Sequence, residues 1–336
     1  MRNISQNFTF GNQWSFGDPF TIVIDTRNTK TGGSASNEFL FPQNPNTLDS
    51  YINFLVDWGD GQFSRITSQS QATVPHTYAT PGIYTVNFYK PKGISTILSP
   101  RYENYPNETN KLLKVLRWGQ FNNARGSFSG CANLDLSEVE GTPIFNGNAG
   151  SNFRNCTNLT TIKGLNNIIF RGAFIQVFNG CVNFNQTCTL NVPNATSTTH
   201  VFYGCSKLNS QVTLNAPSTS TLTNFFQNST ILNVLPIFNT PNVVDVSDMF
   251  NGCTAFNKDV STMLDWSKVT NMTRFMFGKS SANYNATYYD NLLIALDAGG
   301  QTGVTLGMGS IKHTSAGLAA KNNLIAKGWT ITDGGV

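Results

Sequence analysis

The sequence predicts a mainly β protein with some α structure: a small β-sandwich, then a stack of short repeats, then a small α/β C-terminal cap. Three observations predict this. Residues 15–98 alternate between apolar and polar positions, a phrase that starts with Phe recurs about every 25 residues, and after Tyr284 the apolar spacing becomes helical. We therefore divide the chain into residues 1–98 (sandwich with an N-terminal arm), 99–112 (junction), 113–284 (repeats) and 285–336 (cap).

The N-terminal part is predicted to contain strands at residues 20–25, 51–56 and 83–88, because apolar side chains alternate there with polar ones. The dipeptide Asp60-Gly61 predicts a hairpin turn. Trp58, just before it, is expected to be the large apolar side chain that fills the space between two sheets.

The phrase Asp57-Trp58-Gly59-Asp60-Gly61, followed by His76-x-Tyr78 and Gly82-x-Tyr84-x-Val86, resembles a PKD domain. The resemblance covers about 80 residues and implies an immunoglobulin-like sandwich of the kind used outside cells as a spacer or adhesion module. Asp57 and Asp60 also suggest calcium, but two carboxylates three residues apart at a tight turn are better interpreted as turn caps.

The repeats share the phrase Phe-x-Gly/Asn-Cys-x-x-Leu. Its Phe lies at positions 128, 153, 178, 202, 226 and 250, and a degenerate copy begins at Phe277. A unit this short cannot bury its own apolar face, so neighbouring units must stack. We expect a short strand in each unit, such as residues 189–192 or 212–215, all joined in one parallel sheet. The Gly or Asn two residues after Phe is expected to be left-handed.

Cysteine occupies the same place in five repeats, which predicts a column of small buried side chains. A straight column cannot place ligands tetrahedrally around a metal ion, and Ser229 and Ser280 stand where two further cysteines would be. We therefore interpret the column as reduced and structural. The residues predicted to be structural are Trp58, Asp60, Phe128, Cys131, Phe153, Cys156, Phe178, Cys181, Phe202, Cys205, Phe250 and Cys253.

The phrase Val269-Thr270-Asn271-Met272-Thr273-Arg274-Phe275-Met276-Phe277 resembles the BspA-like leucine-rich repeats of bacterial surface proteins and phage-encoded proteins. The resemblance covers about residues 113–284 and implies a leucine-rich-repeat solenoid. After it, two helices are expected, one through Leu292 and Leu296 that ends at Gly299-Gly300, and one with Ser315 as N-cap. A final strand is expected at residues 329–332.

The sequence contains no pattern typical of an enzyme, a cofactor site or a metal site. Its three histidines, His76, His200 and His313, lie in different predicted elements, and no motif joins any of them to a nucleophile. We predict no catalytic, cofactor-binding or metal-binding residues. No run of Lys and Arg suits nucleic acid, and no apolar stretch is long enough for a membrane span.

Composition predicts a protein that works outside the cell. Charged residues are only 12%, about half the usual share, and the polar remainder is rich in Asn, Ser, Thr and Gly. Residues 1–8 lack the apolar core of a signal peptide, so we expect a route to the outside that needs no export, such as lysis. The apolar arm at residues 7–10 with Trp14 is expected either to dock on a partner or to be the first strand.

These observations favour a non-enzymatic phage virion surface protein: a decoration, fibre or tail component. Its expected partners are other virion proteins and a host surface glycan or protein. The alternative is a bacterial cell-surface adhesin. An intracellular scaffold is a third hypothesis, against which the PKD resemblance argues.

Overall fold

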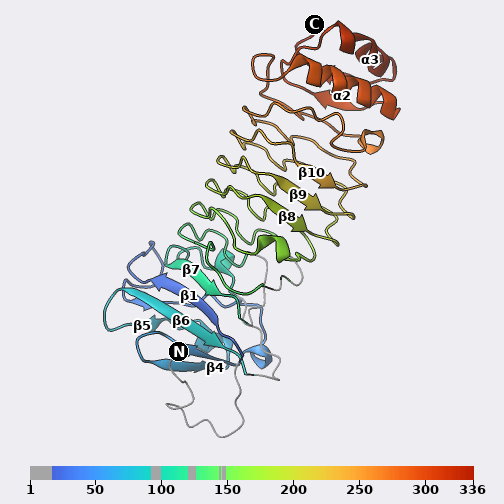
Figure 1. Cartoon of the computed structure of the whole chain (residues 1–336). Helices are drawn as coiled ribbons and strands as arrows, with labels where there is room; N and C mark the ends of the chain where they lie inside the picture. The colour runs from blue at the N-terminus through green and yellow to red at the C-terminus, as the bar shows by residue number, and fades with distance from the viewer. Residues whose placement is uncertain (1–16, 92–99, 120–125, 144, 146–148) are drawn as a thin grey trace.

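The computed structural model describes residues 17–91, 100–119, 126–143, 145 and 149–336. The molecule is elongated, with a block of strands at its N-terminal end, stacked loops along its length and two helices at its C-terminal end (Figure 1). The predicted N-terminal arm at residues 7–10 with Trp14 lies outside the described residues. The described strands are β1 (Phe20–Asp25), β2 (Glu38–Phe39), β3 (Phe54–Asp57), β4 (Phe63–Ile66), β5 (His76–Thr77), β6 (Ile83–Tyr89), β7 (Leu112–Arg117), β8 (Cys188–Asn191), β9 (Val212–Asn215), β10 (Ile237–Asn239), β11 (Thr305–Gly307) and β12 (Thr330–Thr332).

The helices are short except for the last two. They are α1 (Gln69–Ala72), α2 (Ala286–Gly299) and α3 (Ser315–Ala326), with single 3-10 turns η2 (Asp49–Tyr51), η3 (Tyr102–Asn104), η4 (Leu165–Asn167) and η5 (Trp266–Lys268).

The N-terminal block is built on one antiparallel sheet in the order β4-β3-β6-β1-β7. The predicted hairpin at Asp60-Gly61 is confirmed, because it joins the paired strands β3 and β4, and the N–H of Trp58 donates to the carbonyl of Gln62. Strand β7 pairs with β1 on one side and forms isolated parallel bridges from Lys114 and Arg117 to the next loop of the chain on the other. This strand therefore joins the block to the stack.

The expectation of a mainly β protein with some α structure agrees with the structure, but the finer prediction of an immunoglobulin-like sandwich followed by a leucine-rich-repeat solenoid is wrong. The described strands form separate sheets of five, three, two and two strands. The second sheet of the expected sandwich is only the pair β2–β5, and the fifth strand of the main sheet is β7, which the sequence assigned to the repeats. The expected continuous parallel sheet is limited to β8, β9 and β10, because most other loops contribute only a single bridging residue.

Successive loops of residues 126–279 lie one above another, and we call each of these loops a rung. Backbone hydrogen bonds hold neighbouring rungs at about one strand spacing: the N–H of Phe153 donates to Val177, that of Phe178 to Val201 and that of Phe202 to Phe225. The bonds lie at the Phe turn as well as in the short sheet. They therefore align every rung with its neighbour along the axis seen in Figure 1.

The phenyl rings of the repeated phrase form a column through the core of the stack. The rings of Phe128, Phe153, Phe178, Phe202, Phe226 and Phe250 are all 0% exposed. Adjacent centroids are 5.8, 5.6, 5.2, 5.8 and 5.8 Å apart and the planes lie within 13° of parallel. Tyr102 from the junction stacks on Phe128 at 6.5 Å, and Trp118 meets the same ring edge-on at 5.8 Å. These two residues start the column at its N-terminal end.

The C-terminal helices and the pair β11–β12 close the other end of the stack. Isolated bridges join Met272 to Leu306 and Ser280 to Ser310, so the cap continues the rungs directly. Helix α2 ends at Gly299 with Gly300 as its C-cap (φ 78°), as predicted for the Gly299-Gly300 stop. The N-cap of α3 is Thr314 and not Ser315 as predicted, since the Thr314 side chain accepts the N–H of Ala316.

Candidate binding surface

The cysteine column is a chain of hydrogen bonds that runs beside the phenyl column. The thiol of Cys156 donates to the carbonyl of Phe128 at 3.1 Å, and Cys181, Cys205 and Cys253 donate to the column Phe one repeat earlier at 2.8, 3.1 and 2.9 Å. Burial raises the pKa of each of these thiols, which keeps them protonated as donors. All six cysteines are buried and unpaired in the structure.

This geometry explains why serine can stand in the column. The hydroxyl of Ser229 donates to the carbonyl of Phe202 at 2.9 Å, in the place of the missing thiol. The position therefore selects a small side chain with a donor, which Cys and Ser share. The predicted column residues all lie in the core, so they build the scaffold and do not face a ligand.

The last repeat has a different register from the one predicted. The N–H of Phe250 donates to Phe275 and that of Gly252 to Phe277, which places Met276 in the phenyl column and Lys279 in the cysteine column. Phe277 is 54% exposed. The prediction that the degenerate phrase begins at Phe277, with Ser280 in place of Cys, is therefore wrong by one residue.

Lys279 is buried at this end of the column, where it is only 2% exposed. Its ammonium group donates to the carbonyls of Thr254 and Asn283 at 2.8 and 2.9 Å and lies 5.9 Å from the centre of the Tyr284 ring. Burial lowers the pKa of Lys279 to about 8. The side chain ties the last full rung to the start of the cap.

The turn that carries each column Phe has left-handed backbone on both sides. The predicted left-handed residue two positions after Phe is confirmed at Gly130, Asn155, Gly180, Gly204, Asn228 and Gly252. A second left-handed position, two residues before Phe, was not predicted. It is occupied by Ser151, Gln176, His200, Asn224, Asp248 and Arg274, with φ between 54° and 59°. Asn, Asp and His tolerate this conformation better than most residues, and a polar residue two positions before each column residue from Phe153 to Met276 was the available signal.

The side chains at these turns form a polar surface along one edge of the stack, which we call the turn-edge strip. It consists of the residues two before and one after the column Phe in four successive rungs: Gln176, Asn179, His200, Tyr203, Asn224, Gln227, Asp248 and Asn251. All except Asp248 are partly exposed. Seven of the eight are neutral at pH 7, and the carboxylate of Asp248 pairs with Arg274 at 2.9 Å. The strip thus offers hydrogen-bonding groups with almost no net charge.

The strip contains one aromatic pair at its centre. The rings of His200 and Tyr203 are 5.7 Å apart, and the amide of Asn228 donates to the Tyr203 hydroxyl at 3.3 Å. Burial lowers the pKa of His200, although the Asp248 charge acts in the opposite direction, so the imidazole is neutral at pH 7. The backbone N–H of His200 donates to Thr223 in the next rung, which fixes the position of the pair.

The predicted turn caps of the N-terminal block are confirmed. Asp57 and Asp60 each accept a backbone N–H of the turn, from Gly59 at 3.0 Å and Gln62 at 2.9 Å. The other oxygen of Asp60 lies 2.9 Å from Nε2 of His76, whose ring stacks on Trp58 at 4.5 Å. Trp58 is 4% exposed. These residues therefore hold the hairpin together.

The structure brings none of the three histidines next to another: His76 lies in β5, His200 in the strip and His313 just before α3. Among the described residues, no group of three or more His, Cys, Asp and Glu side chains is arranged to hold a metal ion. Within the same part of the chain, none of the helices has the length and apolar character needed to cross a bilayer.

Comparison with known proteins identifies one family over part of the chain. Residues 172–289 match the family described as Mycoplasma protein of unknown function, DUF285. The match covers about a third of the chain, including the whole turn-edge strip and the start of α2. No curated protein and no solved structure matches the chain.

Proposed function

We propose that this protein is a non-enzymatic surface protein that binds a host glycan or host protein through the turn-edge strip. We place it on the surface of a phage virion, as a decoration, fibre or tail component in contact with other virion proteins. The observation that carries the proposal is the strip itself, where each of four rungs contributes two polar side chains, mostly neutral amides, around the His200–Tyr203 pair.

The chemistry of the strip suits a ligand that is rich in hydroxyl groups. Amide side chains both donate and accept hydrogen bonds, and the Tyr203 ring gives an apolar face with a polar tip. The left-handed turns fix the directions in which these side chains leave the backbone, and the rung-to-rung hydrogen bonds hold them at a constant spacing. A site that is ordered before binding loses less entropy when the ligand arrives.

The proposed location rests on the composition. A chain with 12% charged residues and an Asn- and Thr-rich surface is typical of proteins outside cells. The second candidate is a bacterial cell-surface adhesin. The matching family spans the residues of the strip and is described from Mycoplasma, which is consistent with a bacterial protein.

The binding proposal is tested by Tyr203→Ala in an assay of the purified protein on host cell envelopes. We expect binding to fall about 10-fold or more, as for a central aromatic side chain in an interface. Tyr51→Ala is the matched control, because Tyr51 is also partly exposed, at 41%, but lies in the N-terminal block. Equal binding by both variants and the unchanged protein would exclude the strip as the binding surface.

The location is tested by mass spectrometry of purified virus particles and of the bacterial surface fraction from the same culture. Stoichiometric recovery of peptides from both ends of the chain in particles supports the virion protein. Recovery only on the bacterial surface supports the adhesin.

A further inference from the structure

The three-stranded sheet ends at β10 because the following rung does not supply a strand. Phe226 and Phe250 are 24 residues apart, whereas Phe250 and Met276 are 26 apart. In this longer rung the residues that would pair with β10 form a turn and a bend, followed by η5. Among the described residues, no backbone hydrogen bond joins β10 to this rung. The outer edge of β10 is therefore open.

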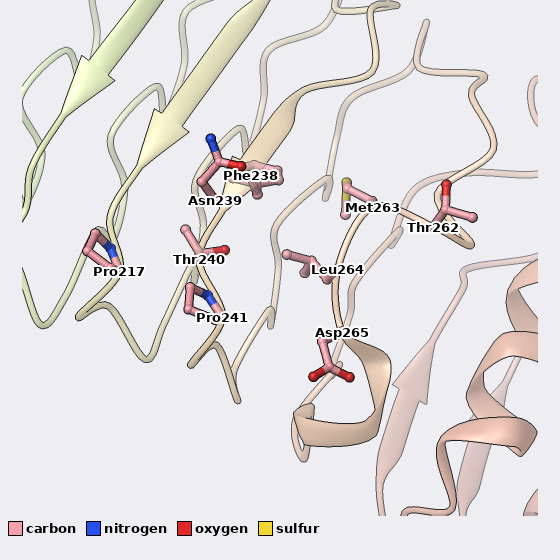
Figure 2. Close-up of a pocket in the computed structure, with 9 residues that line it drawn as sticks. All are labelled: Pro217, Phe238, Asn239, Thr240, Pro241, Thr262, Met263, Leu264 and Asp265. Carbon is pink, nitrogen blue, oxygen red and sulfur yellow. The ribbon is translucent and has the colours of Figure 1, made fainter.

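A groove of about 560 Å³ lies along this edge, within the size range of ligand-holding sites in proteins. Phe238, Asn239 and Thr240 line one side of it, and Met263 and Leu264 line the facing side (Figure 2). Leu190 and Leu214, which precede Phe238 in the same core-facing position, are 0% exposed. Phe238 is only partly buried, because no strand covers it.

Three polar groups at the groove have no partner among the described residues, and for two of them the equivalent group in an earlier rung has one. The N–H groups of Val192 and Ala216 donate to Asn215 and Asn239 of the next rung, but the equivalent N–H of Thr240 has no acceptor in the described residues. The hydroxyl of Thr240 is buried, since the residue is only 6% exposed, and it has no hydrogen-bond partner among the described residues. A buried hydroxyl without a hydrogen bond is unfavourable, and it marks a place for a missing group.

The third group is the side-chain oxygen of Asn239. The amide of Asn215 donates to the oxygen of Asn191 at 2.8 Å, and the amide of Asn239 donates to the oxygen of Asn215 at 2.5 Å. Each rung thus donates to the one before it, and the oxygen of Asn239 is left as the acceptor for a fourth. Within the described part of the chain, no donor reaches it.

We propose that an extended peptide segment of a partner protein binds in this groove as the next strand of the sheet, parallel to β10. A backbone carbonyl of the peptide would accept from the backbone N–H of Thr240. An Asn or Gln side chain of the peptide would donate to the side-chain oxygen of Asn239, and an apolar side chain would cover Phe238. An open edge of a sheet is a common docking site for extended peptides. The inference goes beyond the proposed adhesion function, because the groove is separate from the turn-edge strip and either can fail without the other.

The test uses a labelled peptide with the sequence of residues 210–217, Ser-Gln-Val-Thr-Leu-Asn-Ala-Pro, which forms the strand of an earlier rung in this chain. We expect saturable binding to the full-length protein by fluorescence anisotropy, with Kd below about 1 mM. Hydrogen exchange should slow at residues 237–240 when the peptide is added. A peptide with Pro in place of Thr213 lacks a backbone N–H that would face β10, by analogy with the pairing of β9 on β8, and should bind more weakly.

Two protein variants locate the binding. Asn239→Ala removes the side-chain oxygen that would accept from the peptide and should weaken binding about 3- to 10-fold by removing one hydrogen bond. Leu264→Arg places a long side chain in the groove and should abolish binding. Leu318→Arg, at a 39% exposed position of α3, is the matched control and should leave binding unchanged. Thermal melting checks that each variant is folded.

The proposal is overturned if the peptide does not bind up to about 1 mM. It is also overturned if binding survives Leu264→Arg in a folded protein, or if the slowed amides lie outside residues 237–240. If neutral oligosaccharides slow hydrogen exchange at the groove and the peptide does not bind, the groove is a sugar site. That result would also reject the peptide strand.

Discussion

Replacing Phe178 with alanine tests whether the phenyl column is the main source of stability of the stack. The Phe178 side chain is 0% exposed and its ring lies 5.6 Å from Phe153, 5.2 Å from Phe202 and 4.8 Å from Phe184. Removal of a buried Phe ring costs about 3–5 kcal/mol, and each lost ring pair is worth about 0.5–1.5 kcal/mol beyond burial. With three ring neighbours, Phe178→Ala should lie near 5 kcal/mol, the upper end of that range.

The same experiment decides the register of the last repeat. Met276 is 0% exposed and Phe277 is 54% exposed. Met276→Ala should therefore cost about 2–5 kcal/mol, as for a buried Met, whereas Phe277→Ala should change the free energy of unfolding by less than about 0.5 kcal/mol. If the repeat began at Phe277 instead, Phe277→Ala would be the more destabilising of the two substitutions.

The measurement is urea unfolding followed by circular dichroism, with hydrogen exchange of the rung peptides as a second probe. Two probes are needed because stacked repeats can unfold in parts, so that one midpoint does not describe the whole chain. The reasoning is refuted if Phe277→Ala is as destabilising as Phe178→Ala, or if Met276→Ala has no effect on exchange in the adjacent rung.

Three further predictions concern polar groups. Lys111 is fully buried, and its ammonium group lies 3.9 Å from the buried Glu108 carboxylate. Lys111→Met should therefore lower the free energy of unfolding in urea by about 3–5 kcal/mol, and adding Glu108→Gln should restore part of that stability. No recovery in the double variant would contradict the pairing. Folding lowers the pKa of Lys279 from 10.5 to about 8, so the charged form is disfavoured in the native state. The stability of the unchanged protein relative to Lys279→Met should therefore rise between pH 8 and 10.5. A stability difference that is constant with pH would contradict this. The side-chain oxygen of Asn209 accepts the backbone N–H of Asn233 in the next rung at 2.7 Å, whereas the side-chain amide of Asn215 donates to Asn191. Asp keeps the acceptor but loses the donor, so Asn209→Asp should leave the melting temperature at pH 7 nearly unchanged and Asn215→Asp should lower it. Equal effects would contradict the assigned directions.

Local features of the fold were predicted well because they depend on neighbouring residues. The alternation at residues 20–25 and 212–215 gives β1 and β9 with the predicted ends. The Gly and Asn residues after each Phe are left-handed, and Asp60-Gly61 closes a hairpin, since both depend on backbone sterics at one or two positions. The repeat spacing placed six phenyl rings in one column.

The candidate surfaces depend on residues that are far apart in the sequence, so the sequence did not identify them. The strip takes its side chains from fixed positions beside the column Phe, but the repeat alone does not show that they share one edge of the stack. No motif marks the groove, which lies where the longer rung forms no strand after β10. The offset in the last repeat was hidden because Phe275 and Phe277 flank Met276, and only the rung-to-rung hydrogen bonds select Met276 for the column.

By itself, the sequence determined the repeat, its short strands, its left-handed turn after Phe and the two closing helices, because these follow from side-chain pattern and backbone sterics over a few residues. Only the tertiary structure decided which strands pair. Strand β7 has the same alternating pattern whether it joins β1 or starts a separate stack, and its antiparallel pairing with β1 gives one five-stranded sheet in place of the expected sandwich. Strand pairing depends on which edges meet in space, and the local pattern of a strand does not contain that information.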